Sequence, residues 1–249
     1  MRVYLMQVSA YILIEKNVQR CGVMSRKAAI ILLILDILVG LSLFFGGINK
    51  PSEYTNAMAE QAEDERRKIA LTFDDGPHPY YTEQLLDGLK ERGVVATFFV
   101  TGEHAKLHPD VIKRMQEEGH LIGNHTYSHI QLTKSNREKF KEELIATNEV
   151  LKEITGEEVE YVRPPYGSWD KSFESELNMF PVLWTVDPLD WSSRNASRIT
   201  EKIVSKVEEN DIILMHDYYD TSVTAALQTV DELLEEGYTF VTVEEILFD

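Results

Sequence analysis

The amino-acid sequence predicts an α/β fold, a distorted (β/α) barrel of about seven parallel strands, preceded by one N-terminal transmembrane helix. Two observations predict the barrel. From residue 68 onward, short apolar runs alternate with amphipathic segments, and ionisable residues follow the apolar runs at five places. Strands that alternate with helices imply parallel pairing through right-handed crossovers. A third observation, one long apolar stretch near the N-terminus, predicts the transmembrane helix.

The first half of the predicted barrel contains three strands and two helices. Its short apolar runs are typical of buried strands and lie at residues 68–73, 94–100 and 120–125. The segment 80–93 is amphipathic and closes with glycine, and the segment 109–119 starts with proline and closes with glycine. Proline at the start and glycine after the end are the usual signals of a helix.

The second half continues the alternation to the end of the chain, with no internal repeat or low-complexity segment. Short apolar runs predict further strands at 159–165, 180–186, 211–216 and 238–243. Helical patterns predict helices near 136–155, 170–178, 196–209 and 222–236.

The placement of ionisable residues distinguishes a barrel from an open doubly wound sheet. In both folds the functional residues gather where strands end. Five predicted strand ends carry such residues, which are Asp74 with Asp75, His125, Arg163, Asp187 with Asp190, and His216. A ring of contributors suits the mouth of a barrel better than the single crevice of an open sheet.

The long apolar stretch covers residues 28–48. At a rise of 1.5 Å per residue it would span about 31 Å, the thickness of a bilayer core. Asp36 would cost about 3 kcal/mol, whereas fourteen Leu, Ile, Val and Phe residues would each contribute about −0.5 kcal/mol, so insertion is favoured. Arg26 and Lys27 lie just upstream and predict a cytoplasmic N-terminus by the positive-inside rule.

The chain is therefore expected to divide into four parts: a cytoplasmic segment 1–27, a transmembrane signal anchor 28–48, a linker 49–67 and an extracytoplasmic domain 68–249, which places the protein in the cell membrane with a single pass. Two alternatives stay open. The sequence "AMA" at 57–59 resembles a signal-peptidase site, so cleavage would release the domain, and the apolar stretch could be a buried helix of a soluble protein. Met24 also resembles a natural start, which would make residues 1–23 an upstream extension.

The charge of the chain limits its partners. The composition is that of a globular protein, with 43% hydrophobic and 27% charged residues, and the net charge is −17. Residues 1–50 hold six basic and two acidic residues, so the acidic excess lies in the predicted extracytoplasmic part. Such a charge disfavours nucleic acid as a partner. No obligate protein partner is evident, and Cys21, the only cysteine, leaves that part without a disulfide.

Two short stretches suggest a metal site. His125 and His129 are spaced to share one face of a helical turn, and Asp74 and Asp75 end another strand. Adjacent side chains at a strand end point in different directions, so one carboxylate could bind a cation while the other takes a proton from an attacking water. A plain strand-terminating turn and a polar loop with two histidines are the alternatives.

Five stretches together resemble the ordered motifs of the NodB-type polysaccharide deacetylases, carbohydrate esterase family four. They are "TFDDG" at 72–76, "HTYSH" at 125–129, "RPPYG" at 163–167, "DPLDW" at 187–191 and "ILMHD" at 213–217. The similarity covers about residues 68–247, nearly the whole predicted extracytoplasmic part. Five motifs in order are far more specific than any one of them.

The resemblance implies roles for ten residues. Asp75, His125 and His129 would bind a divalent metal, usually zinc, although cobalt or another first-row ion could serve. Four residues would be catalytic: Asp74 as the base, Arg163 as its partner, His216 as the general acid and Asp190 as the partner that raises the pKa of His216. Three would contact substrate: the backbone N–H of Tyr166 at the oxyanion, and Trp184 with Leu214 around the acetyl methyl group.

Other residues of these motifs have no distinct expected role. Asp187, Tyr127 and Trp191 are expected only to shape the cleft. The remaining histidines are expected to be surface or loop residues, namely His78, His104, His108 and His120, with His78 as the best further candidate for a substrate contact.

The resemblance implies a metal-dependent hydrolase that removes N-acetyl groups from a cell-envelope polysaccharide, with peptidoglycan N-acetylglucosamine as the first expected substrate. Chitooligosaccharide and O-acetylated xylan stay open as alternative substrates. A noncatalytic glycan-binding envelope protein is an alternative of another class. A metallopeptidase is disfavoured because Thr126 stands where the motif H-E-x-x-H has glutamate.

Overall fold

The structure is a computed structural model that describes residues 67–248. The predicted cytoplasmic segment, the transmembrane anchor at 28–48 and all but the last residue of the linker lie outside the described residues, so they stay predictions. Between Arg67 and Phe248, no helix combines the length and the apolar character that crossing a bilayer requires.

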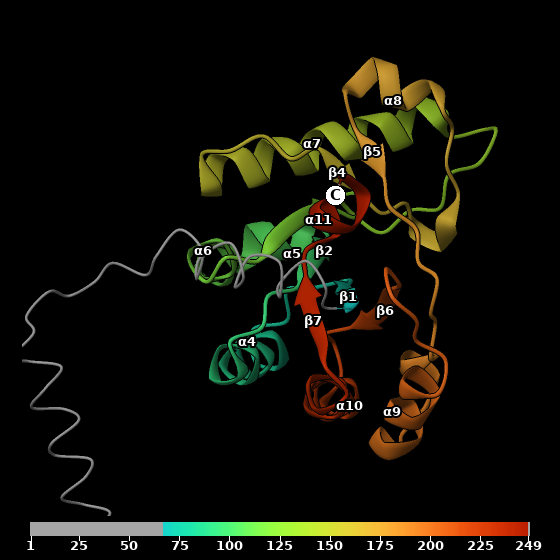
Figure 1. Ribbon diagram of the computed structural model, residues 1–249. Helices are drawn as coiled ribbons and strands as arrows, with labels where there is room; N and C mark the ends of the chain where they lie inside the picture. The colour runs from blue at the N-terminus through green and yellow to red at the C-terminus, as the bar shows by residue number, and fades with distance from the viewer. Residues whose placement is uncertain (1–66, 249) are drawn as a thin grey trace, which may run out of the picture. The chain divides into compact units, whose positions relative to one another are not determined.

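Seven parallel strands form one curled sheet (Figure 1), which confirms the predicted parallel α/β architecture. The strands are β1 (Arg67–Asp74), β2 (Thr97–Val100), β3 (Leu121–Asn124), β4 (Tyr161–Val162), β5 (Phe180–Pro181), β6 (Ile212–His216) and β7 (Tyr238–Val241). Their order is β5-β4-β3-β2-β1-β6, and β7 pairs with the first half of β1. All carboxyl ends of the strands therefore meet at one end of the sheet.

Helices surround the strands (Figure 1). They are α4 (Tyr81–Arg92), α5 (Gly102–Leu107), α6 (Pro109–Glu117), α7 (Arg137–Thr155), α8 (Ser172–Leu177), α9 (Ala196–Val204), α10 (Asp220–Glu235) and α11 (Val243–Phe248), with 3₁₀ turns η1 (Pro165–Gly167) and η2 (Asp190–Ser192). Glycine ends α4 in the left-handed conformation, as the sequence predicts, and Gly156 ends α7 in the same way. The six-residue helices α5 and α11 were not predicted.

The predicted strand at 180–186 is only partly formed, because this segment crosses from one edge strand of the sheet to the other. After β5 the chain stays with β4, where the Val182 N–H donates to the carbonyl of Val162. It then reaches β6, where the Leu214 N–H donates to the carbonyl of Val186 at 2.9 Å. A segment shared by β4 and β6 cannot pair fully with either, and this is the distortion of the barrel.

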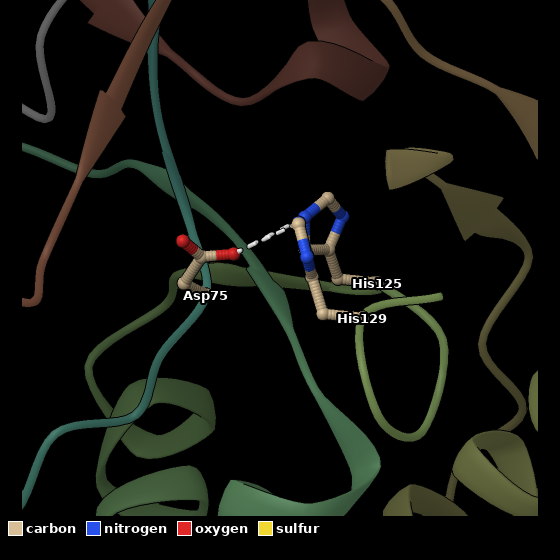
Figure 2. Close-up of side chains that lie close together, drawn as sticks. All are labelled: Asp75, His125 and His129. Carbon is tan, nitrogen blue, oxygen red and sulfur yellow. Dashed lines mark ion pairs between the residues drawn. The ribbon is translucent and has the colours of Figure 1, made fainter. Parts of the chain in front are cut away.

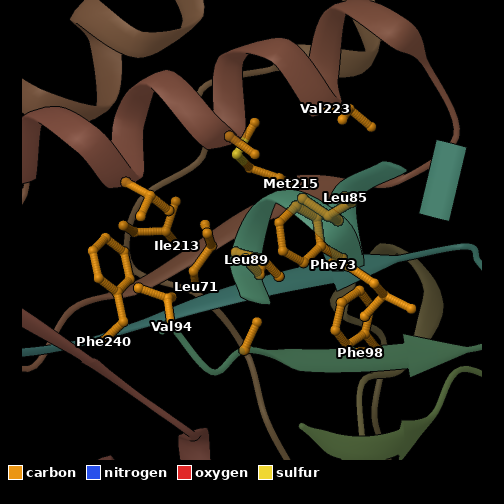
Figure 3. Packing of buried hydrophobic residues seen from close by; sticks show 14 of the residues in the cluster. Leu71, Phe73, Leu85, Leu89, Val94, Phe98, Ile213, Met215, Val223 and Phe240 are labelled. Atoms are coloured by element: carbon orange, nitrogen blue, oxygen red, sulfur yellow. The ribbon is translucent and has the colours of Figure 1, made fainter. Parts of the chain in front are cut away.

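Strand periodicity separates an outer and an inner face of the sheet, since successive side chains point to opposite faces. Ile69, Leu71 and Phe73 of β1 face outward and join the main core with residues of β2, β6, α4 and α10 (Figure 3). Ala70 and the other residues of a second cluster face inward, namely Phe99, Tyr161, Val182, Ile212 and Val243. This small apolar plug fills the interior below the strand ends.

The same alternation directs three predicted site residues to the inner face. Asp74 follows inward-facing Ala70 by four positions, and Arg163 and His216 follow inward-facing Tyr161 and Ile212 by two and four. All three lie at the carboxyl ends of their strands, above the apolar plug. Strand periodicity alone therefore places the three side chains in one layer of the interior, at the carboxyl ends of the strands.

Candidate active site

Asp74 and Arg163 form a buried ion pair at the centre of this layer. The Arg163 guanidinium is 0% exposed, and its Nη1 donates to Asp74 Oδ1 at 2.8 Å and to Thr72 Oγ1 at 2.6 Å. The guanidinium also lies over the Phe99 ring, 4.2 Å from its centroid. A buried charge without a partner is costly, and Asp74, the partner that the family resemblance implies, lies opposite Arg163.

Asp75, His125 and His129 converge at the next position along the rim (Figure 2). Asp75 Oδ1 is 3.4 Å from His125 Nε2 and 3.3 Å from His129 Nε2. The three side chains come from the end of β1 and the loop after β3. His125 and His129 lie in this irregular loop and not on the helical turn that their spacing suggested. Burial raises the pKa of Asp75, but the nearby imidazole of His125, with the charges of His129 and His216, outweighs it and lowers the pKa to about 2.

The donor atoms of this trio suit a divalent metal ion. His125 Nδ1 donates to the carbonyl of Arg163 at 2.6 Å, because a carbonyl can only accept, and the lone pair of the neutral ring is therefore on Nε2. Asp75 Oδ1 is buried and has no hydrogen-bond partner among the described residues. One carboxylate oxygen and two imidazole nitrogens that face each other form a donor set typical of zinc and similar ions.

Backbone strain concentrates at the motif loops. Seven non-glycine residues between 67 and 248 have a positive φ, and five of them lie in the motifs: Asp75, Thr126, His129, Tyr166 and Leu189. Left-handed conformations are unfavourable for most side chains and persist where the surrounding structure enforces them, which is most common at functional sites. The loops are therefore shaped to place particular atoms.

His216 and Asp190 form a second pair across the site from the trio. His216 Nδ1 lies 2.8 Å from Asp190 Oδ1, and the His216 N–H donates to Asp190 Oδ2 at 2.9 Å, so Asp190 fixes both the ring and the backbone. Burial lowers the pKa of His216, but the hydrogen bond and charge of Asp190, aided by Asp74 and Asp75, raise it to about 9. The imidazole is therefore protonated at neutral pH.

The three predicted substrate contacts lie around this centre. Tyr166, in η1, is 67% exposed, and its ring meets the His129 ring edge-on at 5.1 Å. Trp184 is half-buried in the crossing segment, with its ring 5.8 Å from the Arg163 guanidinium. Leu214 is nearly buried on β6, in register with Thr72 and two residues before His216.

One of the remaining histidines is not at the surface. His120 lies in the connection before β3, but it is only 6% exposed, and its Nδ1 accepts the Ala96 N–H at 3.0 Å. It sits directly before β3, where the chain enters the core. Burial lowers its pKa to about 4, so it is a neutral core histidine.

Sequence reasoning missed several residues that brace the site. Thr72 Oγ1 accepts a hydrogen bond from Arg163. The sequence could have identified Thr72, because it precedes Asp74 by two positions and so lies on the same strand face. Asp217 is fully buried against Gly76, and any side chain at position 76 would collide with the Asp217 carboxylate. The carboxylate accepts a hydrogen bond from Thr82, and burial raises the pKa of Asp217 to about 7. His104 and Glu143 hold the loops that carry Asp75 and His129. No local sequence pattern marks these two residues.

Comparison with known proteins identifies the family. The sequence model of the family described as polysaccharide deacetylase matches residues 61–182. A peptidoglycan-N-acetylglucosamine deacetylase of Bacillus cereus is 34% identical over 208 residues, which cover 80% of this chain and 97% of that protein. A chitooligosaccharide deacetylase of Rhizobium leguminosarum is 40% identical over 162 residues, 64% of this chain and 75% of that protein.

The peptidoglycan-N-acetylmuramic acid deacetylase PdaC of Bacillus subtilis is 38% identical over 187 residues, 75% of this chain. This chain spans only 40% of the length of PdaC. A solved structure of PdaC superimposes with a TM-score of 0.71, covering 74% of this chain and 91% of that one. The chain therefore belongs to the polysaccharide deacetylase family, carbohydrate esterase family four.

Proposed function

We propose that this protein is a metal-dependent hydrolase that removes N-acetyl groups from N-acetylglucosamine in a cell-envelope polysaccharide, most directly peptidoglycan. The observation that carries the proposal is the trio Asp75, His125 and His129, with its unpartnered carboxylate oxygen, beside the buried Asp74–Arg163 pair. Family membership and the names of the relatives support the same reaction. Zinc is the proposed ion, and cobalt or another first-row metal is the alternative.

The trio would hold the ion through Asp75 Oδ1, His125 Nε2 and His129 Nε2. When bound, a divalent ion supplies Lewis acidity that activates water and polarises a carbonyl oxygen. The remaining chemistry belongs to the side chains around the trio. Asp74 Oδ2 lies 3.8 Å from His125 Nε2, so this carboxylate faces the proposed ion position.

Asp74 is the proposed base. As the water oxygen attacks the carbonyl carbon of the acetyl group, Asp74 takes the proton of that water, and Arg163 keeps the carboxylate oriented until then. The Tyr166 N–H would donate to the developing oxyanion, since backbone donors aimed at this charge stabilise the transition state. The left-handed φ of 59° at Tyr166 sets the direction of its peptide.

His216 is the proposed acid. When the carbon–nitrogen bond breaks, the amine needs a proton, and the His216 imidazolium can supply it because Asp190 keeps the ring charged. The products are acetate and a free amine on the sugar. Trp184 and Leu214 would form the apolar wall around the acetyl methyl group.

The substrate and the location are the finer parts of the proposal. Relatives are named for peptidoglycan N-acetylglucosamine, peptidoglycan N-acetylmuramic acid and chitooligosaccharide, which supports an N-acetylated amino sugar as the target. An anchor at residues 28–48 would hold the domain in the membrane beside the envelope polymer, and cleavage after it would release the domain. O-acetylated xylan is the alternative acetylated substrate.

Acetate release tests the proposal. Full-length protein is freed of metal with a chelator and then titrated with zinc or cobalt in the presence of peptidoglycan, chitin oligomers or acetylxylan. We expect metal-dependent acetate release from the amino-sugar polymers. Glycan binding without acetate release, at every metal tested, would instead identify a noncatalytic glycan-binding protein.

The pH profile tests the acid. With the pKa of His216 raised to about 9, the imidazolium persists through neutral pH, and kcat/KM should fall as pH rises through about 9. Asp190→Asn removes the negative partner while burial, which lowers the pKa, remains. We expect the alkaline limb of this variant to move toward 6.5 or below. A limb that stays near pH 9 in Asp190→Asn would contradict the role of Asp190.

A further inference from the structure

Two of the three proposed metal ligands are held in left-handed backbone conformations. Asp75 has a φ of 75° and His129 a φ of 57°. Neither is glycine, so each conformation needs neighbouring groups that enforce it. His125, the third ligand, has its ring fixed by the carbonyl of Arg163. The groups that fix the other two ligands lie on helices α5 and α7.

His104 fixes Asp75. Its Nδ1 donates to the Asp75 carbonyl at 2.8 Å, since a carbonyl can only accept. The His104 ring is itself half-buried and stacks on Tyr218, with centroids 5.5 Å apart and planes at 27°. Beside it, the Thr101 N–H donates to the Gly76 carbonyl at 3.0 Å. The peptide after Asp75 is therefore held from the side of α5.

Glu143 fixes the residue before His129. Both oxygens of its carboxylate accept from Ser128, from the backbone N–H at 2.8 Å and from the hydroxyl at 2.7 Å. At the start of the same loop, Asn124 Oδ1 accepts the Thr126 N–H at 2.7 Å. The loop that carries His129 is thus bound to α7 at the position where its backbone turns left-handed.

We propose that His104 and Glu143 are positioning residues of the metal site, which hold Asp75 and His129 in these backbone conformations so that their ligand atoms meet at one point. This inference rests on the proposed function in one respect, that Asp75 and His129 bind the ion. Neither positioning residue touches the trio's ligand atoms or the proposed reacting groups through its side chain. Their contribution is to hold the ligand atoms of Asp75 and His129 in position before the ion binds.

Substitutions at His104 separate its hydrogen bond from its ring. His104→Phe keeps a ring against Tyr218 and removes the N–H, whereas His104→Asn keeps an N–H donor and removes the ring. Zinc affinity of the full-length protein is measured by competition with a chromophoric chelator. We expect His104→Phe to bind zinc about 10–100-fold more weakly, the usual loss when an outer partner of a ligand is removed. His104→Asn should recover most of that affinity.

Substitutions at Glu143 follow the same design. Glu143→Leu removes both acceptors for Ser128, and Glu143→Gln keeps a carbonyl for the N–H and an amide for the hydroxyl. We expect a similar loss for Glu143→Leu and near wild-type affinity for Glu143→Gln. Because the two residues act on different ligands of one ion, the double variant should bind zinc more weakly than either single variant.

Three readouts distinguish positioning from general destabilisation. At saturating zinc, kcat of the single variants should approach the wild-type value, while the zinc concentration for half-maximal activity rises. Thermal unfolding of the metal-free proteins shows whether each variant is folded. Wild-type zinc affinity in folded His104→Phe and Glu143→Leu, or equal losses in the matched Asn and Gln variants, would overturn the inference.

The affinity measurement uses no glycan, so it fails separately from the proposed function. A wild-type protein that binds zinc and releases no acetate would refute the deacetylase proposal and leave the zinc affinities as the test of His104 and Glu143. A wild-type protein that binds no divalent ion would refute both.

Discussion

Asp74→Asn is expected to lower kcat/KM by about 10²–10⁴, the usual contribution of a general base, while zinc binding is retained. Asparagine has the shape of aspartate and keeps an oxygen that can accept from Arg163 Nη1, but it cannot take a proton from the attacking water. Asp74 is not one of the three proposed metal ligands, so their ligand atoms are unchanged. Kinetics and a zinc titration of the same preparation measure the two effects separately.

Stability is the confounding effect in this variant. Arg163 is fully buried, and removing the charged partner of a buried pair costs up to about 3–5 kcal/mol. The amide oxygen and Thr72 Oγ1 would still accept from the guanidinium, which reduces the cost. Denaturant unfolding of each variant therefore accompanies the kinetics, so that the activity of the folded fraction can be compared.

Asp187→Asn is the matched control. Asp187 belongs to a neighbouring motif, and within residues 67–248 its Oδ1 accepts only the backbone N–H of Leu189, at 2.8 Å, a bond that asparagine can also make. We expect this variant to retain nearly full activity. If Asp74→Asn keeps more than a tenth of wild-type activity, proton transfer to Asp74 is not part of the rate-determining chemistry and another base must be sought.

The inner layer of the site could be predicted from sequence because strand geometry is simple. A period of two puts Thr72 and Asp74 on one face of β1, and parallel register sets Asp74 beside His216. The order of motifs then supplied the partners Arg163 and Asp190, and their 2.8 Å contacts with Asp74 and His216 agree with the predicted pairs. Strand geometry and the family resemblance together were sufficient for Asp74, Arg163, Asp190 and His216, whereas Thr72 was missed although it lies on the same strand face.

Other features depend on contacts that no local pattern records. The strand predicted at 180–186 is shortened because the segment is shared between β4 and β6, a consequence of how the sheet curls. His120 is polar in sequence but enters the core because its Nδ1 satisfies the Ala96 N–H. His104 and Glu143 hydrogen-bond to the loops of the proposed metal ligands, and they come from helices whose neighbours are set only by tertiary packing.

Asp75→Ala is expected to remove metal binding itself. Asp75 supplies the only anionic atom of the trio, and the loss should exceed the roughly 10–100-fold that follows from losing an outer partner. Activity at a stoichiometric concentration of zinc should disappear with the ion. Unlike Asp74→Asn, this variant should show a lower activity and a lower zinc affinity together, and a large excess of zinc should restore part of both.

Thermal unfolding with and without zinc provides the decisive comparison. An ion that binds only the folded protein stabilises it by about 2.7 kcal/mol at a concentration 100 times its Kd. This stabilisation should raise the Tm of the wild type when zinc is added. The Tm of Asp75→Ala should not rise at the same zinc concentration. Asp75→Asn is the matched variant, because asparagine tolerates the left-handed conformation while lacking the charge. A zinc-induced rise in Asp75→Ala equal to that of the wild type would mean that the ion binds elsewhere.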